Sequence, residues 1–346
     1  MAVYGTLIQN FVDESINMNT IIETIDLEQD ILNESIVSNI GESIIKFIKK
    51  ISEVIKKILK SLTSKLFEDE RKKFIDRCKD LQSKIDDLKR ENRYNEEDLK
   101  DAKKENQELE RILKSIDSII MKNDEIFFVP TDYIDENKLK ALIDIKGSDL
   151  RSAVSNLQTL SNFFDENDGN SVEKALHNIT SWINDDAKVF YDIVPERFLD
   201  GKNLVRDIKS MIKNEVINSK EKNTFRFFGD SGYSSLTKSV EGRFETIWNF
   251  SRNIERALDN LNGILNKNLT KVSEELAIFG TKYYRNYNRS EGYKVYHNTM
   301  INLSSTISIL STVVQYLGVL SGYCIQATTS LNIAIHYLIS TFGRHW

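Results

Sequence analysis

The chain has 346 residues, of which 29% are charged and 40% hydrophobic, a balance typical of a chain that buries a core. Its formal net charge of −5 disfavours a general nucleic-acid-binding protein. It contains 2 prolines and 14 glycines, so few that a many-turned β-sandwich or barrel is disfavoured and long helices are expected. Two cysteines cannot build a disulfide framework, and four scattered histidines do not form a zinc cluster. We therefore expect no metal and no other cofactor.

The first 41 residues form an acidic leader with seven carboxylates and neither lysine nor arginine. A secretory signal needs basic residues ahead of an apolar block, so this composition predicts a protein that is made in a cytoplasm.

Residues 42–66 carry a positive net charge, because they contain seven lysines and only two acidic residues, Glu42 and Glu53. Apolar residues recur three or four positions apart from Ile44 to Leu66, which predicts an amphipathic helix with its lysines on the opposite face. Such a helix can lie on a membrane surface or pack against its own protein, and we favour the second interpretation. The lysines that could contact DNA or lipid are Lys49, Lys50, Lys56 and Lys57.

Residues 68–122 have the pattern of a coiled-coil arm. Phe74, Leu81 and Leu88 lie seven apart, with Cys78 and Ile85 between them. The apolar seam fails around Tyr94 and then resumes. One long helix or an antiparallel helical hairpin fits this pattern, and we prefer the hairpin. Leu81, Ile85 and Leu88 are predicted assembly positions, and Cys78 is predicted to be a buried structural thiol.

Residues 124–136 are the predicted linker between this arm and a helical body at 137–346. The apolar run 126–129 stops at Pro130, which indicates an extended crossing segment or a lone edge strand. We therefore predict an all-α fold: an elongated helical bundle with an N-terminal coiled-coil or helical-hairpin arm. At most it contains a short β segment near 126–129.

Residues 282–297 interleave tyrosines with lysines and arginines. Rings and cations in alternation can stack on bases and neutralise phosphates, but they are equally typical of a half-buried connection between helices, which we favour. The possible DNA or lipid contacts here are Tyr284, Arg285, Tyr287 and Arg289.

From Val295 to Gly343 the chain has no Asp, Glu, Lys or Arg. Three explanations are open: a transmembrane helix, a pair of helices buried in the centre of the subunit, or an interface between subunits. We favour burial within the subunit, and we expect His336 to be a core residue. The candidate assembly positions are Leu310, Val314, Leu317, Gly318 and Gly322.

The segment order, with Leu32-Asn33-Glu34-Ser35 in the leader, resembles uncharacterised internal or minor virion structural proteins of large tailed bacteriophages. The leader is similar to capsid-targeting segments that a prohead protease removes after a Leu- or Ile-x-Glu triplet. Leu32–Glu34 fits this triplet, as do Ile21–Glu23 and Ile51–Glu53. The resemblance implies processing at Leu32, Glu34 and Ser35, synthesis in a bacterial host cytoplasm, and a final location in the virion.

The sequence contains neither G-x-S-x-G nor H-E-x-x-H, and its histidines and cysteines are far apart, so we expect no enzymatic activity and no small-molecule substrate. The leading hypothesis is a structural protein of a phage virion that acts through helix–helix assembly with itself or with other virion proteins. Nucleic acid and, during delivery, a membrane are possible further contacts. The alternative is a helical pore-forming protein that inserts residues 306–340 as a hairpin. A third possibility is a protein that binds a host factor.

Overall fold

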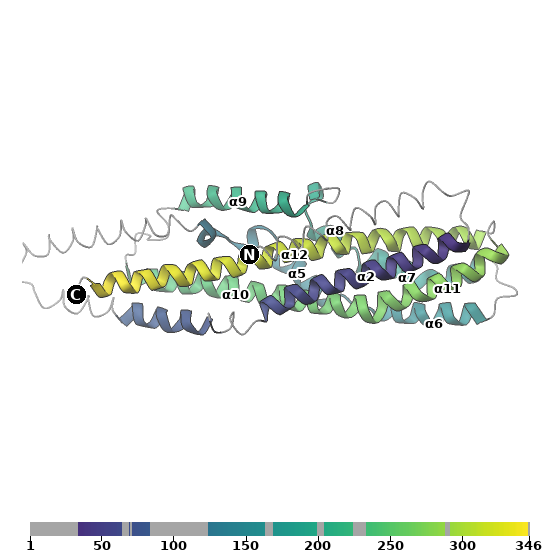
Figure 1. Ribbon diagram of the computed structural model, residues 1–346, viewed down its shortest axis with the longest axis horizontal. Helices are drawn as coiled ribbons and strands as arrows, with labels where there is room; N and C mark the ends of the chain where they lie inside the picture. Colours follow the sequence, from purple (N-terminus) through teal and green to yellow (C-terminus); the bar gives the residue numbers. More distant parts are fainter. Residues whose placement is uncertain are drawn as a thin grey trace, which may run out of the picture. The chain divides into compact units, whose positions relative to one another are not determined.

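The computed structural model describes residues 34–63, 69, 71–83, 124–162, 169–198, 204–223, 233–287 and 291–344. Every regular element within these ranges is a helix, which confirms the predicted all-α fold (Figure 1). The hairpin predicted near Tyr94 lies outside the described residues.

Of the two interpretations of residues 126–129, an extended crossing segment or a lone edge strand, the strand is wrong. Asp124–Phe127 forms a 3₁₀ helix, η1, and Pro130–Asp132 forms a second one, η2. A lone strand leaves its backbone groups without partners, whereas the amide N–H of Asp132 donates to the carbonyl of Val129 at 3.1 Å. The apolar side chains of Ile126, Phe127 and Phe128 are buried.

The chain divides into two compact units, each assembled from three separate segments. The first unit contains Met1–Leu59, Ile134–Ile208 and Asn253–Val319, and the second contains Lys60–Tyr133, Lys209–Arg252 and Leu320–Trp346. The boundary between Tyr133 and Ile134 falls within the predicted linker. The units nevertheless differ from a contiguous arm and body, because long helices contribute residues to both. These helices are α2 (Glu34–Leu62), α9 (Leu204–Asn223), α10 (Tyr233–Ile264) and α12 (Glu291–Arg344).

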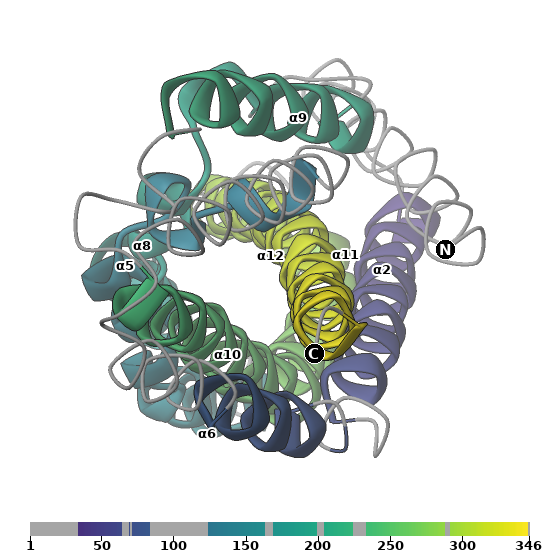
Figure 2. The same cartoon turned by 90° about the vertical axis from the view of Figure 1, so that its left-hand side faces the viewer.

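In the first unit, α2 packs against α11 (Thr270–Tyr287) and α12, and the three helices run side by side (Figures 1 and 2). Gly41 of α2 abuts Ala277 of α11, and Gly318 of α12 abuts Ile58 of α2. The hydroxyl of Tyr296 in α12 donates to the carbonyl of Leu276 in α11 at 3.1 Å.

Elsewhere in the first unit, α6 (Ser148–Asn162) packs against α7 (Gly169–Ser181) and α11. The short helices α5 (Glu136–Asp144) and α8 (Val189–Ile193) pack against each other. Two π-helical turns, Trp182–Asp186 and Leu265–Leu269, continue α7 and α10. A 3₁₀ turn, Glu196–Phe198, follows α8.

The neutral C-terminal stretch lies within one helix, α12, so the predicted pair of helices buried in the subunit is wrong. The insertion of residues 306–340 into a membrane stays a prediction. Nothing in that stretch forces a turn, because it has no proline and a helix tolerates isolated glycines. His336 is exposed, which corrects its predicted place in the core.

The second unit contains a helical segment at 71–83 with parts of α9, α10 and α12. The ring of Phe74 stacks on that of Phe244 in α10, with 3.9 Å between centroids. Cys78 and Leu81 are buried on the same face, one and two helical turns further on. The described part of the predicted seam therefore packs within the chain.

Candidate functional site

The outer side of α2 is a strongly charged feature of the described part of the first unit. The helix buries one stripe, whose exposed fractions are 0–5%, made of Ile44, Phe47, Ile48, Ile51, Ile55 and Ile58. This burial confirms the prediction that the helix packs against its own protein. We call the exposed lysines on the opposite side that belong to the first unit the lysine face: Lys46, Lys49, Lys50, Lys56 and Lys57.

Helical geometry gathers the lysine face into a narrow strip. At about 100° per residue its five side chains leave the axis within an arc of about 120°, opposite the buried stripe. Glu42 and Glu53 are also exposed on this side, so residues 42–57 carry five positive and two negative charges. The result is a local charge of +3 on a chain whose net charge is −5.

The tyrosine-rich segment divides into a buried and an undescribed part. Tyr293 and Tyr296 are buried, and the Tyr296 ring lies 5.7 Å from that of Phe279, centroid to centroid. Burial raises the pKa of Tyr296, so its hydroxyl stays protonated and donates to the Leu276 carbonyl. This packing agrees with a connection between helices. The side chains of Tyr284, Arg285 and Tyr287, at the end of α11, and the whole of Arg289 lie outside the described residues.

Helix α12, which contains the neutral stretch, bonds several of its hydroxyl groups to its own backbone. Thr299, Thr306 and Thr328 are buried, and each donates to the carbonyl of the residue four positions earlier, at 2.8–3.0 Å. A helix that bonds its own hydroxyls in this way can enter a protein core or a bilayer. By length and composition alone, Gly292–His336 qualifies to cross a membrane, with a mean hydropathy of 1.5. In the apolar stretch of this segment, 78% is buried inside the protein.

Four of the five predicted assembly residues of α12 lie in the first unit, and Gly322 lies in the second. Leu310, Val314 and Leu317 are all 0% exposed. A Cβ atom added to Gly318 would lie 2.9 Å from Cδ1 of Ile58, whereas Gly322 has open space beside it. Of the predicted arm positions, Leu81 is buried, and Ile85 and Leu88 lie outside the described residues.

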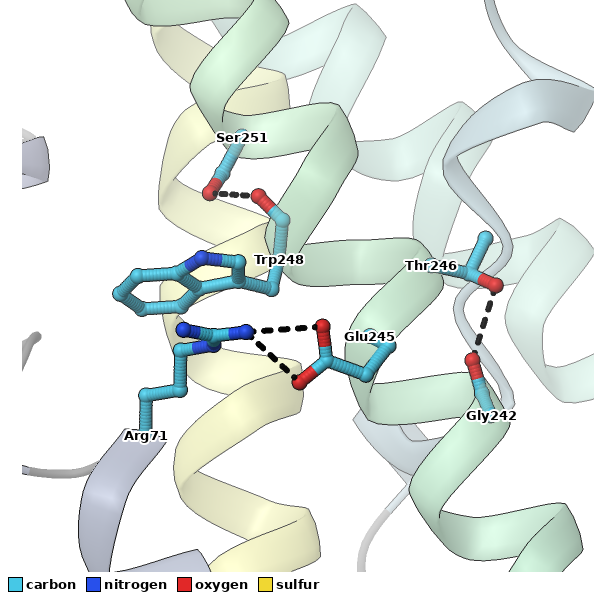
Figure 3. A network of polar contacts seen from close by, with 6 residues as sticks. All are labelled: Arg71, Gly242, Glu245, Thr246, Trp248 and Ser251. Atoms are coloured by element: carbon cyan, nitrogen blue, oxygen red, sulfur yellow. Dashed lines mark hydrogen bonds and ion pairs between the residues drawn. The ribbon is translucent and has the colours of Figure 1, made fainter. Parts of the chain in front are cut away.

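A cluster in the second unit was not predicted from the sequence (Figure 3). Nη2 of Arg71 lies 3.2 Å from each carboxylate oxygen of Glu245, and the guanidinium lies flat against the indole of Trp248, 5.3 Å from its centroid. Arg252 approaches the same ring at 5.0 Å. The spacing of Trp248 and Arg252, one helical turn apart, is the signal that could have revealed half of this cluster.

The Arg71–Trp248 cluster has a structural role. The side chains of Arg71 and Glu245 are 39% and 31% exposed, so water screens their ion pair and its contribution to stability is small. Trp248 is 4% exposed and joins the stack of Phe74 and Phe244. The cation–π contacts therefore cover the edge of the aromatic cluster that packs the segment 71–83 against α10.

The two thiols lack the properties of nucleophiles. Cys78 and Cys324 are both buried and free. Burial, with a smaller contribution from the nearby Glu241 carboxylate, raises the pKa of Cys78 to about 12, and burial also raises the pKa of Cys324. Within the described ranges, no group of three or more His, Cys, Asp or Glu side chains is placed to hold a metal ion.

The three candidate processing triplets occupy different places. Ile51 and Ser52 are buried in the middle of α2, so the triplet that ends at Glu53 is inaccessible in the folded protein. Glu34 is the first residue of α2, and Ser35 is the second. Leu32 and the triplet Ile21–Glu23 lie outside the described residues.

No family model matches this chain, and neither a curated protein nor a solved structure shows significant similarity to it. The resemblance to virion proteins therefore stays a prediction.

Proposed function

We propose that the protein is a non-enzymatic structural protein of a tailed-phage particle, an internal or minor component of the head. The observation that carries the proposal is that the described packing contacts of α2 begin at Gly41, seven residues beyond Glu34. A cut after Glu34 would remove an acidic leader and leave the remainder of α2, with its buried stripe, in place. The bond after Glu53 follows the buried residues Ile51 and Ser52 in the middle of α2, so we expect processing after Glu34 instead.

Assembly of such a particle would use surfaces other than the neutral helix. Leu317 is buried within the chain, so Leu317→Asp would place a charge in the core and unfold the subunit before any interface was tested. Exposed residues are the better choice for assembly experiments, because their substitution leaves the core intact.

The proposal is tested by mass spectrometry of purified particles of the encoding phage, reading the N-terminus of the mature protein. We expect the protein in the particle with Ser35 as its first residue. Glu34→Gln should block this processing, whereas the matched variant Glu53→Gln should leave it unchanged. Absence from the particles contradicts the proposal, and presence with an intact N-terminus removes the processing step.

A membrane-active function is the second candidate, favoured by the apolar window of Gly292–His336. It requires α12 to leave the packing around Leu310 and Val314 and to enter the bilayer. Leakage of dye from liposomes, together with flotation of the protein with the lipid, would support it. A protein that causes no leakage and stays unbound excludes it.

A further inference from the structure

We propose that the lysine face of α2 binds the phosphate backbone of duplex DNA without regard to sequence. This binding goes beyond the proposed place in a particle and is measured separately, on the purified protein. The proposal rests on three observations. The orientation of the face is fixed, its charges are spaced along the helix, and the opposite side of the helix is buried in the core.

The orientation of the face is set by packing and hydrogen bonds on the inner side of α2. Besides the buried apolar stripe, the hydroxyl of Ser52 donates to Oδ1 of Asn262 at 2.7 Å and accepts from Nδ2 of Asn266 at 2.8 Å. The contact of Gly41 with Ala277 holds the same helix near its N-terminal end. α2 therefore cannot rotate about its axis without breaking these contacts, and the lysines stay outward.

The spacing of the face suits a line of phosphates. Lys46 and Lys57 are separated by about 16 Å along the helix axis, at 1.5 Å per residue. Duplex DNA presents about one negative charge per 1.7 Å of its axis, so the strip can meet several phosphates at once. Lysine ammonium groups act as compact charges on flexible stems, which favours backbone contacts over reading of bases.

The buried stripe favours DNA over a membrane as the partner. An amphipathic helix binds a bilayer by inserting its apolar face, with lysines adding electrostatic attraction. In α2 the apolar face is already engaged, with Ile48, Ile51 and Ile55 at 0% exposure. The groups of α2 that can still contact a partner are its lysine ammonium groups. Such groups are sufficient to bind a nucleic acid, because they release the counterions condensed on its phosphates.

The negative net charge of the chain does not prevent this contact. At physiological ionic strength charges are screened beyond about 8 Å, so distant carboxylates act weakly on a phosphate that touches the lysine face. Glu53 lies within the face and opposes binding directly. Its position also supplies a test in which binding should become stronger.

The experiment measures fluorescence anisotropy of a labelled duplex of mixed sequence, titrated with the full-length protein at several salt concentrations. Lys49→Ala with Lys56→Ala should weaken binding about tenfold per lysine at 50 mM salt and reduce the slope of log K against log salt by about 2. Glu53→Lys should strengthen binding and steepen the slope by about 1. The matched control is Lys140→Ala with Lys174→Ala, which removes two exposed lysines from α5 and α7 and should change the affinity less than twofold.

Three results would overturn the proposal. The first is no binding of the duplex at protein concentrations above about 100 μM, beyond the usual range of non-specific DNA affinity. The second is an equal loss of affinity in the α2 pair and the α5–α7 pair, which would mean that the lysine face is not the contact. The third is binding to vesicles that contain phosphatidylserine, lost with Lys49 and Lys56, in the absence of DNA binding. Far-ultraviolet circular dichroism of each variant confirms that it is folded.

Discussion

The carbonyl groups of residues 145–147 show how single side chains hold this fold together. These three residues join α5 to α6, and each carbonyl accepts a hydrogen bond from a distant side chain. Nδ2 of Asn260 donates to Ile145 and also to Leu142, both at 3.0 Å, and Nε1 of Trp182 donates to Lys146 at 2.9 Å. Nδ2 of Asn268 donates to Gly147. The end of α5 is thereby capped by side chains from α10 and from the two π-helical turns.

Asn260→Ala should lower the free energy of unfolding by about 1–3 kcal/mol, because it leaves two partly buried carbonyls without their donor. Asn260→Asp should cost more, since a carboxylate of the same size faces two carbonyl oxygens and cannot donate. Chemical denaturation in urea measures both changes. Asn214→Ala, at an exposed position of α9, is the control and should stay within about 0.5 kcal/mol of the parent protein. Equal stability of the Ala and Asp variants would show that the donor is not needed.

The two buried thiols give a prediction about reactivity. With a pKa of about 12, about one Cys78 thiol in ten thousand is ionised at pH 8, and burial keeps reagents away from both cysteines. A thiol reagent such as Ellman's should therefore modify neither cysteine in the native protein at pH 8 and both in guanidinium. Because the pKa is raised, any native reaction of Cys78 should accelerate as the pH increases. Rapid labelling of the native protein at pH 8 would contradict this environment.

At the scale of the elements, the contact between α2 and α11 depends on the absence of a side chain at Gly41. A Cβ atom there would collide with Cβ of Ala277, which cannot swing aside. Alanine ordinarily stabilises a helix interior over glycine by about 0.5–1 kcal/mol. Gly41→Ala should instead destabilise the protein by about 1–3 kcal/mol, because overpacking pushes the two helices apart.

A double-mutant cycle and a control separate packing from helix propensity at this site. Ala277→Gly should restore most of the stability lost in Gly41→Ala, since it makes room for the added methyl group. Gly263→Ala in α10 meets nothing within 4 Å and should be stabilising. Thermal and urea unfolding measure all four variants. Loss of stability in Gly263→Ala as large as in Gly41→Ala would remove the packing explanation.

The elements themselves could be predicted because their signal is local. The three- and four-residue spacing from Ile44 to Ile58 defines which side of α2 is buried, and the structure buries that side. The continuity of α12 and the partition into two units could not be predicted in this way. Both depend on which distant residues meet, such as Phe74 with Phe244 and Tyr296 with Leu276, and hydrophobic periodicity does not encode partners.

The candidate site shows the same division between local and non-local information. Lys49, Lys50, Lys56 and Lys57 were identified from periodicity, because exposed charge opposite a buried stripe is a property of one helix. The cluster of Arg71 with Glu245 and Trp248 joins segments more than 170 residues apart, so no spacing in the sequence reveals that Arg71 belongs to it.

At the scale of the whole molecule, charge is distributed very unevenly along the chain. Residues 1–34 contain seven of the 52 acidic residues and none of the 47 basic ones. Without them the chain keeps 47 basic and 45 acidic residues, so its formal net charge changes from −5 to +2. The predicted cleavage after Glu34 would therefore change the net charge of the protein from negative to positive.

Removal of residues 1–34 should strengthen duplex binding, because the acidic leader competes with DNA phosphates for the lysine face. Its carboxylates also repel the phosphates of the approaching duplex. We expect at least a tenfold increase in affinity at low salt, shrinking as salt rises, in the same anisotropy measurement. The matched control keeps the leader but replaces its seven carboxylates with Asn and Gln, which preserves length and removes charge. Equal affinities for this neutral leader and for the truncated chain would assign the effect to charge. An unchanged affinity after truncation would show that the leader does not compete, and a gain in the truncated chain alone would assign the effect to steric cover.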